Sequence, residues 1–239
     1  MRIALACSFA AIAVLLVGCG GSKSTSSTTT GSTTTAPDNG VSAKSADEIV
    51  AAMQTAVSTA TSVHIVGAGT SGGSSISLNL KLVRGKGGAG HIALGGLGFD
   101  IIRIGQKVYI NASKNFLLHY AGSSAASLSG RWFYVSASAK GLGSLGSLTN
   151  IDALINQILA SHGTLAKGDT TTIDGQPAIA INDAKNGGVL YIATTGPAYP
   201  LELTPGKNNG TGVIKFKSWD QPIALKAPAH PLDYSKLGG

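Results

Sequence analysis

Apolar and polar residues alternate through much of the chain. Between 76 and 82, Ile76, Leu78, Leu80 and Leu82 alternate with serine, asparagine and lysine. A period of two predicts a strand with one apolar face and one wet face. Similar runs predict strands at 63–65, 91–94, 99–104, 107–111, 131–135, 170–173, 178–181, 189–193, 199–203, 213–219 and 223–226. Because the connections are short and rich in glycine, neighbouring strands are expected to pair antiparallel.

Two segments have helical spacing instead. Ser45 and Glu48 form a capping-box pattern, and Ile49, Met53 and Val57 then recur along one face, which predicts a helix ending near residue 61. A second amphipathic helix is predicted over 148–161, capped by Thr149 or Asn150, after a loop of glycine and leucine. Residues 113–130 show no regular pattern.

This order of elements predicts an α+β fold. We expect one large, curled antiparallel sheet of about ten strands, a half-barrel, with two helices on its concave apolar face. Part of that face would line a ligand cavity, although apolar helix and sheet faces most often form only a core. The candidate cavity residues are Val63, Ile65, Leu78, Leu80, Ile101, Ile151, Leu154, Ile158, Ile179 and Ile181.

The N-terminus has a different pattern. An uncharged apolar run from Ile3 ends in Leu16-Val17-Gly18-Cys19, which matches a bacterial lipobox. We expect residues 1–18 to be a lipoprotein signal peptide and Cys19 to carry the lipid anchor at the extracytoplasmic face of the cell membrane. The alternatives are a plain signal peptide or an uncleaved anchor, although the run is shorter than the roughly 20 residues that span a bilayer.

A Ser/Thr-rich segment follows the lipobox. Residues 19–45 contain too few apolar side chains to form a core, so they are expected to be a disordered tether. About 26 such residues span roughly 25–30 Å. The folded domain is therefore expected over 46–239.

Composition narrows the classes of function. The net charge is +7, but only 12% of the residues are charged, and lysine and arginine occur singly. Nucleic-acid binding is not predicted, because no basic cluster occurs. The charge fits either a mild attraction to anionic lipid head groups or an ordinary solvated surface.

The candidate chemistry is sparse. The only cysteines are Cys7 and Cys19, so the mature domain is expected to lack a disulfide. The five histidines show no metal-ligand spacing, and no nucleophile motif occurs. Glycine patterns at 67–72 and 141–146 match a dinucleotide fingerprint but lack its βαβ context. We therefore predict no enzyme activity, no metal and no cofactor.

Several short motifs carry a resemblance to a known family. They are Gly130-Arg-Trp132-Phe, Ile173-Asp-Gly175-Gln-Pro177-Ala, Gly196-Pro-Ala-Tyr199-Pro200-Leu and Phe216-Lys-Ser-Trp219-Asp-Gln-Pro222-Ile, followed by Ala227-Pro228. These motifs follow one another over residues 46–228, and in this order the chain resembles the actinobacterial LppX/LprG-type lipoproteins. Those proteins share the half-barrel fold of the LolA/LolB carriers. The resemblance implies a hydrophobic cavity that binds or carries acylated lipids or glycolipids across the envelope.

Two functions follow from these patterns. The first is a membrane-anchored lipoprotein that binds or carries a membrane lipid or glycolipid, with an envelope transporter as a candidate partner. The second is an envelope interaction module whose half-barrel is filled by its own side chains and which binds a protein. An open apolar pocket of several hundred Å³ favours the first, and a filled core favours the second.

Overall fold

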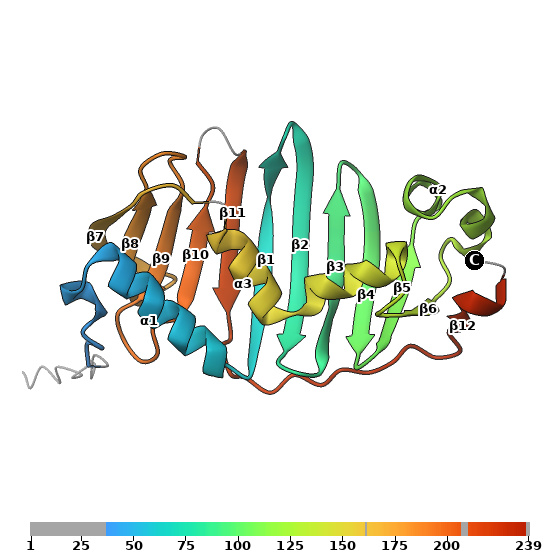
Figure 1. Ribbon diagram of the computed structural model, residues 1–239, viewed down its shortest axis with the longest axis horizontal. Helices are drawn as coiled ribbons and strands as arrows, with labels where there is room; N and C mark the ends of the chain where they lie inside the picture. Colours follow the sequence, from blue (N-terminus) through green and yellow to red (C-terminus); the bar gives the residue numbers. More distant parts are fainter. Residues whose placement is uncertain (1–36, 161, 207–209, 238–239) are drawn as a thin grey trace, which may run out of the picture. The chain divides into compact units, whose positions relative to one another are not determined.

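The computed structural model describes residues 37–160, 162–206 and 210–237. The predicted signal peptide, Cys19 and the tether as far as residue 36 lie outside the described residues. The described part is α+β: a twelve-stranded, mostly antiparallel sheet with several helices (Figure 1). The predicted fold class is therefore confirmed at this level.

The strands follow the spatial order β12-β6-β5-β4-β3-β2-β1-β11-β10-β9-β8-β7, and only the short β12–β6 pair is parallel. Their bounds are Ser62–Ser71 (β1), Ser74–Val83 (β2), Gly87–Leu94 (β3), Leu97–Ile104 (β4), Lys107–Ala112 (β5), Phe133–Ser136 (β6), Leu165–Ile173 (β7), Gln176–Asp183 (β8), Val189–Ala193 (β9), Pro200–Thr204 (β10), Thr211–Lys217 (β11) and Leu232–Asp233 (β12).

The sheet differs from the expected half-barrel. It has twelve strands instead of about ten, and it is not strongly curled. The edge strands β7 and β12 end the order without pairing to each other. Because helices cover one face, the sheet buries its apolar side without closing on itself. We call this covered side the inner face.

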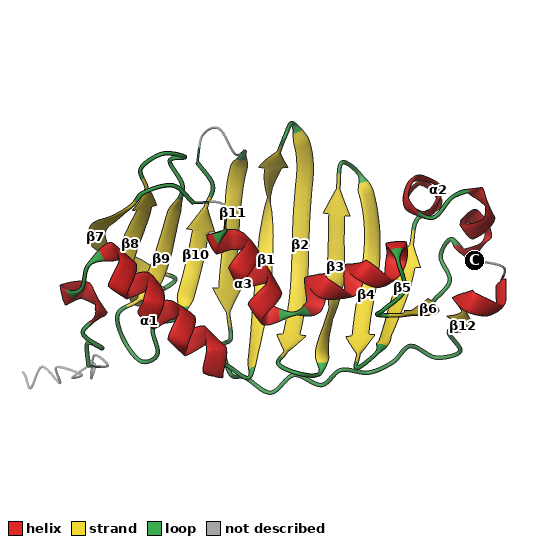
Figure 2. Ribbon diagram, in the orientation of Figure 1, coloured by secondary structure: helices red, strands yellow, loops and turns green. Residues whose placement is uncertain are grey.

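Helices α1 (Ala46–Thr59) and α3 (Ile151–Leu159) lie across the inner face (Figure 2). The capping box of α1 is confirmed: the Glu48 carboxylate accepts from the Ser45 amide at 2.9 Å, and the Ser45 side chain accepts from the Glu48 amide at 3.4 Å. Asn150 caps α3. The loop expected before α3 is instead a 3₁₀ helix, η3 (Gly141–Thr149).

Further helical turns lie where the sequence showed no pattern. Residues 113–130 contain α2 (Lys114–Tyr120) and the 3₁₀ helix η2 (Ser123–Leu128). Ser113 caps α2, and the buried Phe116 and Leu117 attach it to the sheet. Two more 3₁₀ turns, η1 (Val41–Ala43) and η4 (Tyr234–Leu237), lie near the ends of the described chain.

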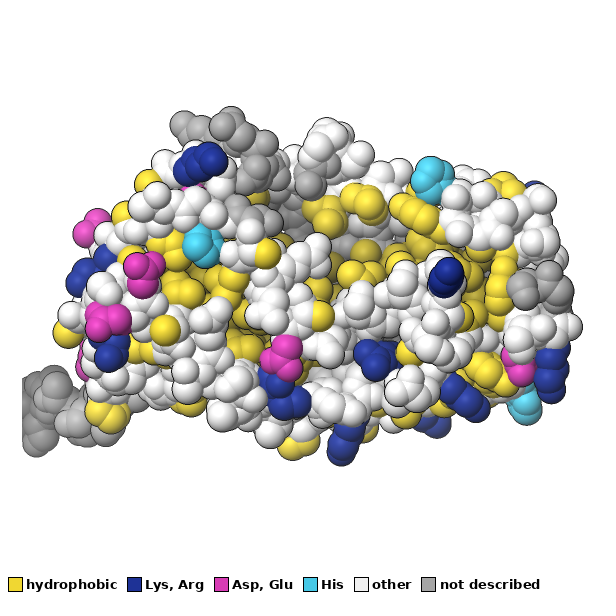
Figure 3. Space-filling view, viewed as in Figure 1, with side chains coloured by type: hydrophobic (Ala, Val, Ile, Leu, Met, Phe, Trp, Pro, Cys, Tyr) yellow, Lys and Arg dark blue, Asp and Glu magenta, His cyan; other side chains and the backbone are white. Residues whose placement is uncertain are grey.

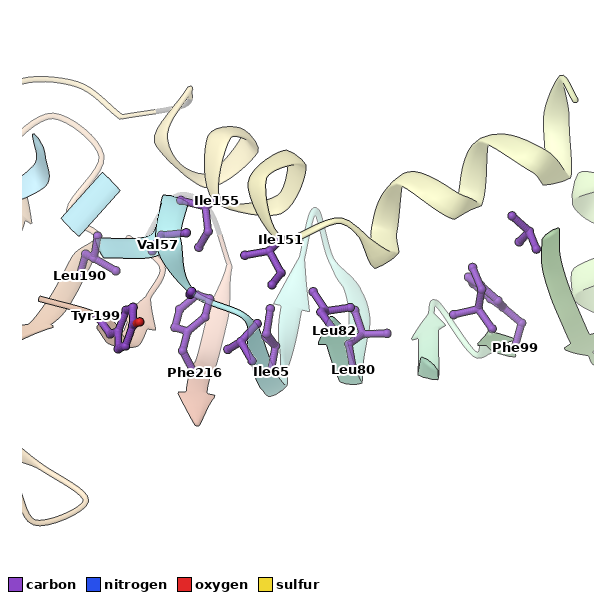
Figure 4. Close-up of a cluster of buried hydrophobic side chains, with 14 of the residues drawn as sticks. Val57, Ile65, Leu80, Leu82, Phe99, Ile151, Ile155, Leu190, Tyr199 and Phe216 are labelled. Carbon is purple, nitrogen blue, oxygen red and sulfur yellow. The ribbon is translucent and has the colours of Figure 1, made fainter. Parts of the chain in front are cut away.

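The hydrophobic core lies between the helices and the inner face. Figure 4 shows Ile151 and Ile155 of α3 on the side that faces the sheet, near Ile65 and Phe216. All four side chains are 5% exposed or less. The β1 register places Ile65 opposite both Leu80 of β2 and Phe216 of β11, so these residues share the inner face.

Arg84, in the β2–β3 turn, joins the helices to the sheet. Its guanidinium group donates to the carbonyl oxygens of Val57 and Ala60 at the end of α1, at 2.5 and 2.6 Å. Its third nitrogen donates to the Asp152 carboxylate in the first turn of α3. The Val57 carbonyl oxygen also accepts from the Ala60 amide at 3.1 Å, so the cation adds a second hydrogen bond there and another at Ala60, which caps the helix.

A second junction lies at the end of β11. Asp220 accepts from the Thr61 amide at 2.7 Å and from the Tyr199 hydroxyl at 2.6 Å. The Tyr199 ring stacks on Trp219 at 4.4 Å. Burial and the hydrogen bond to Asp220 raise the pKa of Tyr199 to about 12. Residues that carried the family resemblance therefore meet at one point of the fold.

Beyond this junction, the chain runs along the ends of the strands (Figure 1). The predicted strand at 223–226 is wrong: these residues are in no strand, and β12 comes only at Leu232. Pro222, Pro228 and Pro231 explain the difference, because proline has no amide hydrogen to donate to a sheet.

We predict that Arg84→Met lowers the free energy of unfolding by about 2 kcal/mol, because it removes the hydrogen bonds of one cation to the Val57 carbonyl, the Ala60 carbonyl and the Asp152 carboxylate. Urea unfolding followed by circular dichroism measures this change. The exposed Lys86 lies in the same turn, so Lys86→Met is the matched control and should change stability little. Equal effects of the two substitutions would show that Arg84 does not hold the helices.

Candidate ligand cavity

A cavity of about 460 Å³ lies between α3 and the inner face of the sheet. Figure 3 shows hydrophobic side chains in the hollow between the helices and the upper ends of the strands. Its apolar lining comes from β1, β2, β3, β7, β8, β9, β10 and β11, and from the helices. The aliphatic and aromatic lining residues are Val50, Ile65, Ile76, Leu78, Leu80, Ile92, Leu148, Leu154, Ile158, Leu159, Leu165, Ile181, Val189, Leu190, Leu203, Ile214 and Phe216.

The floor of the cavity follows from the alternation in β2. Ile76, Leu78 and Leu80 all line the cavity, because every second residue of a strand points to the same face. The register places Leu78 opposite Gly67 on one side and Ile92 on the other. A leucine between a glycine and an isoleucine leaves empty space beside it.

The glycine positions next to this floor leave little room for a larger residue. A Cβ added at Gly67 would lie 3.0 Å from both the Ile214 side chain and the Val213 carbonyl oxygen. At Gly69 it would overlap the Thr211 carbonyl oxygen. The strands therefore approach closely at β1–β11, and the floor has no side chains at these two positions.

The structure places the predicted cavity residues in two groups. One group lines the cavity: Ile65, Leu78, Leu80, Leu154, Ile158 and Ile181. The other group, Val63, Ile101, Ile151 and Ile179, is at most 3% exposed and belongs to the packed core, outside the cavity lining. The second group lies where the inner face is fully covered, which a strand pattern alone does not reveal.

Other lining residues were missed. Ile76 was accessible to sequence reasoning, because it alternates in phase with Leu78. Ile214 and Phe216 lie in a predicted strand and alternate with lysines, but the residues beside them depend on the register with β1, which the sequence does not specify. The polar lining residues Gln157, His162, Asp183, Asn186 and Thr204 have no sequence signal.

Asp183 organises the polar end of the cavity. One carboxylate oxygen accepts from the Gly163 amide at 3.0 Å and from the Asn186 side chain at 2.8 Å. The other accepts from the amides of Asn186 and Lys185, at 2.9 and 3.0 Å. Led by the Asn186 amide, these hydrogen bonds lower the pKa of Asp183 to about 2. The segment that follows α3 is thereby attached to the β8–β9 turn.

The site offers little polar chemistry. Among the described residues, no group of three or more His, Cys, Asp or Glu side chains is placed to hold a metal ion. Within the same residues, every buried side-chain nitrogen and oxygen has a hydrogen-bond partner. An apolar cavity of this kind binds a ligand mainly by removing apolar surface from water.

None of the helices within 37–160, 162–206 and 210–237 combines the length and the apolar character that a bilayer crossing requires.

No protein-family model matches the sequence, and no curated protein matches it. Among solved structures, LprF from Mycobacterium bovis is similar at a TM-score of 0.53 and 15% identity, covering 77% of this chain and 97% of that one. The Mycobacterium tuberculosis lipoprotein LppX gives 0.46 and 14%, covering 80% and 100%. A LolA superfamily protein from Nitrosomonas europaea gives 0.25 and 6%, covering 76% and 95%.

The similarity to LprF confirms the resemblance indicated by the sequence motifs. At such low identity, the similarity to LprF shows the fold and nothing more.

The carboxylate of Asp183 should make stability depend on acid pH. Its pKa is about 2 in the folded chain against an ordinary 3.8, so its stabilising effect is complete above pH 4 and lost as the pH falls toward 2. We predict that Asp183→Asn lowers the melting temperature at pH 5 and that this difference narrows at pH 2. Thermal unfolding at the two pH values measures it. Asp47→Asn, which removes an exposed carboxylate from α1, is the control. A difference that stays constant with pH would contradict the assigned role.

Proposed function

We propose that this chain is a membrane-anchored extracytoplasmic lipoprotein. It binds or carries a lipid or glycolipid, with acyl chains in the cavity between α3 and the inner face. It has no catalytic activity of its own. The signal peptide 1–18 and the acylated Cys19 belong to this proposal and rest on the sequence.

The cavity is the observation that carries the proposal. A volume of about 460 Å³ lies in the range of roughly 300–1,000 Å³ that is usual for ligand pockets. Burial of acyl surface against such a lining contributes about 25 cal/mol per Å². The polar lining lies at one end, beside Asp183, so a lipid can bury its chains among aliphatic residues and keep its head group at the polar end.

The size of this cavity also weighs against the alternative. An interaction module that binds a protein through its surface has no need of an internal space, and a well-packed core leaves few voids larger than a water molecule. The half-barrel of the sequence prediction is not a requirement for lipid binding, since helices over an open sheet also enclose apolar space.

The proposal is tested by native mass spectrometry and lipid extraction of the full chain, made with Cys19→Ala and purified from the envelope of its own host. We expect near-stoichiometric lipid. Leu78→Trp fills the floor of the cavity and should reduce the bound lipid about tenfold, which corresponds to about 1.4 kcal/mol of binding free energy. Ser77→Trp adds the same side chain to the opposite face of β2 and should leave lipid binding unchanged.

Circular dichroism establishes that each variant is folded, and Ile158→Trp blocks the same cavity from α3 if Leu78→Trp does not fold. Protein that is free of lipid after purification, and still free after incubation with host lipids, would overturn the proposal. Equal lipid content in Leu78→Trp and Ser77→Trp would place the ligand elsewhere.

A further inference from the structure

Three large hydrophobic side chains are exposed on the described part of the chain. Leu94 is 42% exposed, Leu118 is 44% and Tyr120 is 48%. Leu94 ends β3, and the other two belong to α2. Figure 1 shows the β3–β4 turn and α2 at the same edge of the sheet, its upper edge in this view. Scattered exposed apolar residues are ordinary, but a group at one edge indicates an interaction surface.

Helix α2 is held firmly while it presents this apolar surface. The Phe116 ring packs against Phe99 of β4 at 4.5 Å and against Tyr120 at 4.7 Å. The Ser113 amide, just before α2, donates to the Gly98 carbonyl oxygen of β4. Phe116 and Leu117 fill the side of α2 that faces the sheet, whereas Leu118 stays 44% exposed and Tyr120, although its ring contacts Phe116, stays 48% exposed.

An apolar row connects this edge to the cavity. Leu94 pairs with Ile76 across β2 and β3, so the two side chains share the inner face. Ile76 and Ile92 both line the cavity, and Leu94 is the next inner-face residue of β3 after Ile92. Figure 3 shows hydrophobic side chains from the hollow to the upper ends of these strands.

Two cations lie close to α2 in the chain. Lys114 lies on α2, and Arg131 follows η2. Arg103 and Lys107 lie at the opposite ends of β4 and β5, and Asp100 of β4 is paired with His91. Exposed apolar side chains between cations match the interface of an anionic bilayer, where apolar groups enter the acyl boundary and cations meet the head groups.

We infer that the β3–β4 turn and α2 form a membrane-contact edge. Leu94, Leu118 and Tyr120 enter the interfacial region of an anionic bilayer, and a lipid passes between bilayer and cavity along Leu94, Ile92 and Ile76. The passage of lipid rests on the proposed function; the contact with the bilayer does not.

The contact is tested with a local reporter in the full chain. Leu118→Trp is mixed with vesicles of equal parts phosphatidylglycerol and brominated phosphatidylcholine. Its emission should shift to shorter wavelength and be quenched, after the signal of Trp132 and Trp219 in the unmodified chain is subtracted. Gln54→Trp, on the exposed side of α1, is the control and should not be quenched. Because bromine quenches only at short range, attachment through Cys19 or residues 1–18 does not imitate the result.

The inference is overturned if Leu118→Trp is no more quenched than Gln54→Trp while the chain sediments with the vesicles. It is also overturned if vesicles of phosphatidylcholine alone and anionic vesicles quench equally, because the charge argument then fails.

A second variant separates contact from lipid binding. Leu94→Ser with Leu118→Ser leaves the Phe99–Phe116–Tyr120 packing intact, so the protein should fold. Transfer of a fluorescent diacyl lipid from vesicles into this variant should slow roughly tenfold or more. The reason is that the two leucine side chains that insert into the bilayer are lost. The lipid held at equilibrium, measured by native mass spectrometry, should not change.

The two proposals fail in different ways. If the unmodified chain never holds lipid but Leu118→Trp is quenched, the lipid-binding function fails and the membrane-contact edge stands. If the chain holds lipid and transfer is unchanged in the double variant, the entry route fails and the lipid-binding function stands.

Discussion

The guanidinium group of Arg84 fixes how the helices lie over the sheet. Its nitrogens reach the last turn of α1 and the first turn of α3 from a single β-turn. At the other end of α3, Asp183 holds the amide of Gly163, just beyond the helix. The roof of the cavity is therefore attached by polar contacts at both ends, and only apolar packing lies between them. This arrangement keeps α3 in place without requiring that the space beneath it be filled.

The cavity itself arises from a mismatch between sheet and helices. Twelve strands offer a wide inner face, whereas α1, η3 and α3 cover only part of it. Where a helix lies directly on the strands, as at Ile151 and Ile155, the packing is dense. Where glycines replace side chains on the strands, as at Gly67 and Gly69, space remains. The residues around this space are aliphatic. Water therefore fills it poorly, whereas a hydrocarbon chain fills it well.

Local signals in the sequence were sufficient to predict the position and type of most helices and strands. Ser45 and Glu48 predicted the start of α1, and the alternation from Ile76 to Leu82 predicted the face of β2 that lines the cavity. Features that depend on register were out of reach, such as the placement of Phe216 beside Ile65. The same holds for α2, which is too short for a periodic pattern. The strand expected at 223–226 does not form, because prolines flank it in the sequence. Val63 and Ile179 were expected in the cavity because a strand pattern identifies a face but not which part of it a helix covers.

The close approach of β1 and β11 has a consequence for how this chain can change over evolutionary time. Most internal spaces are easily lost, since a small residue on the floor needs only one larger replacement. At Gly69 that route is obstructed, because a side chain would overlap the backbone of β11, and at Gly67 it is tight. A substitution at Gly69 therefore strains the β1–β11 pairing instead of closing the cavity. The cavity is thus preserved wherever this strand pairing is preserved. The shape of its roof, and so the ligand it accepts, can change through substitutions in α3.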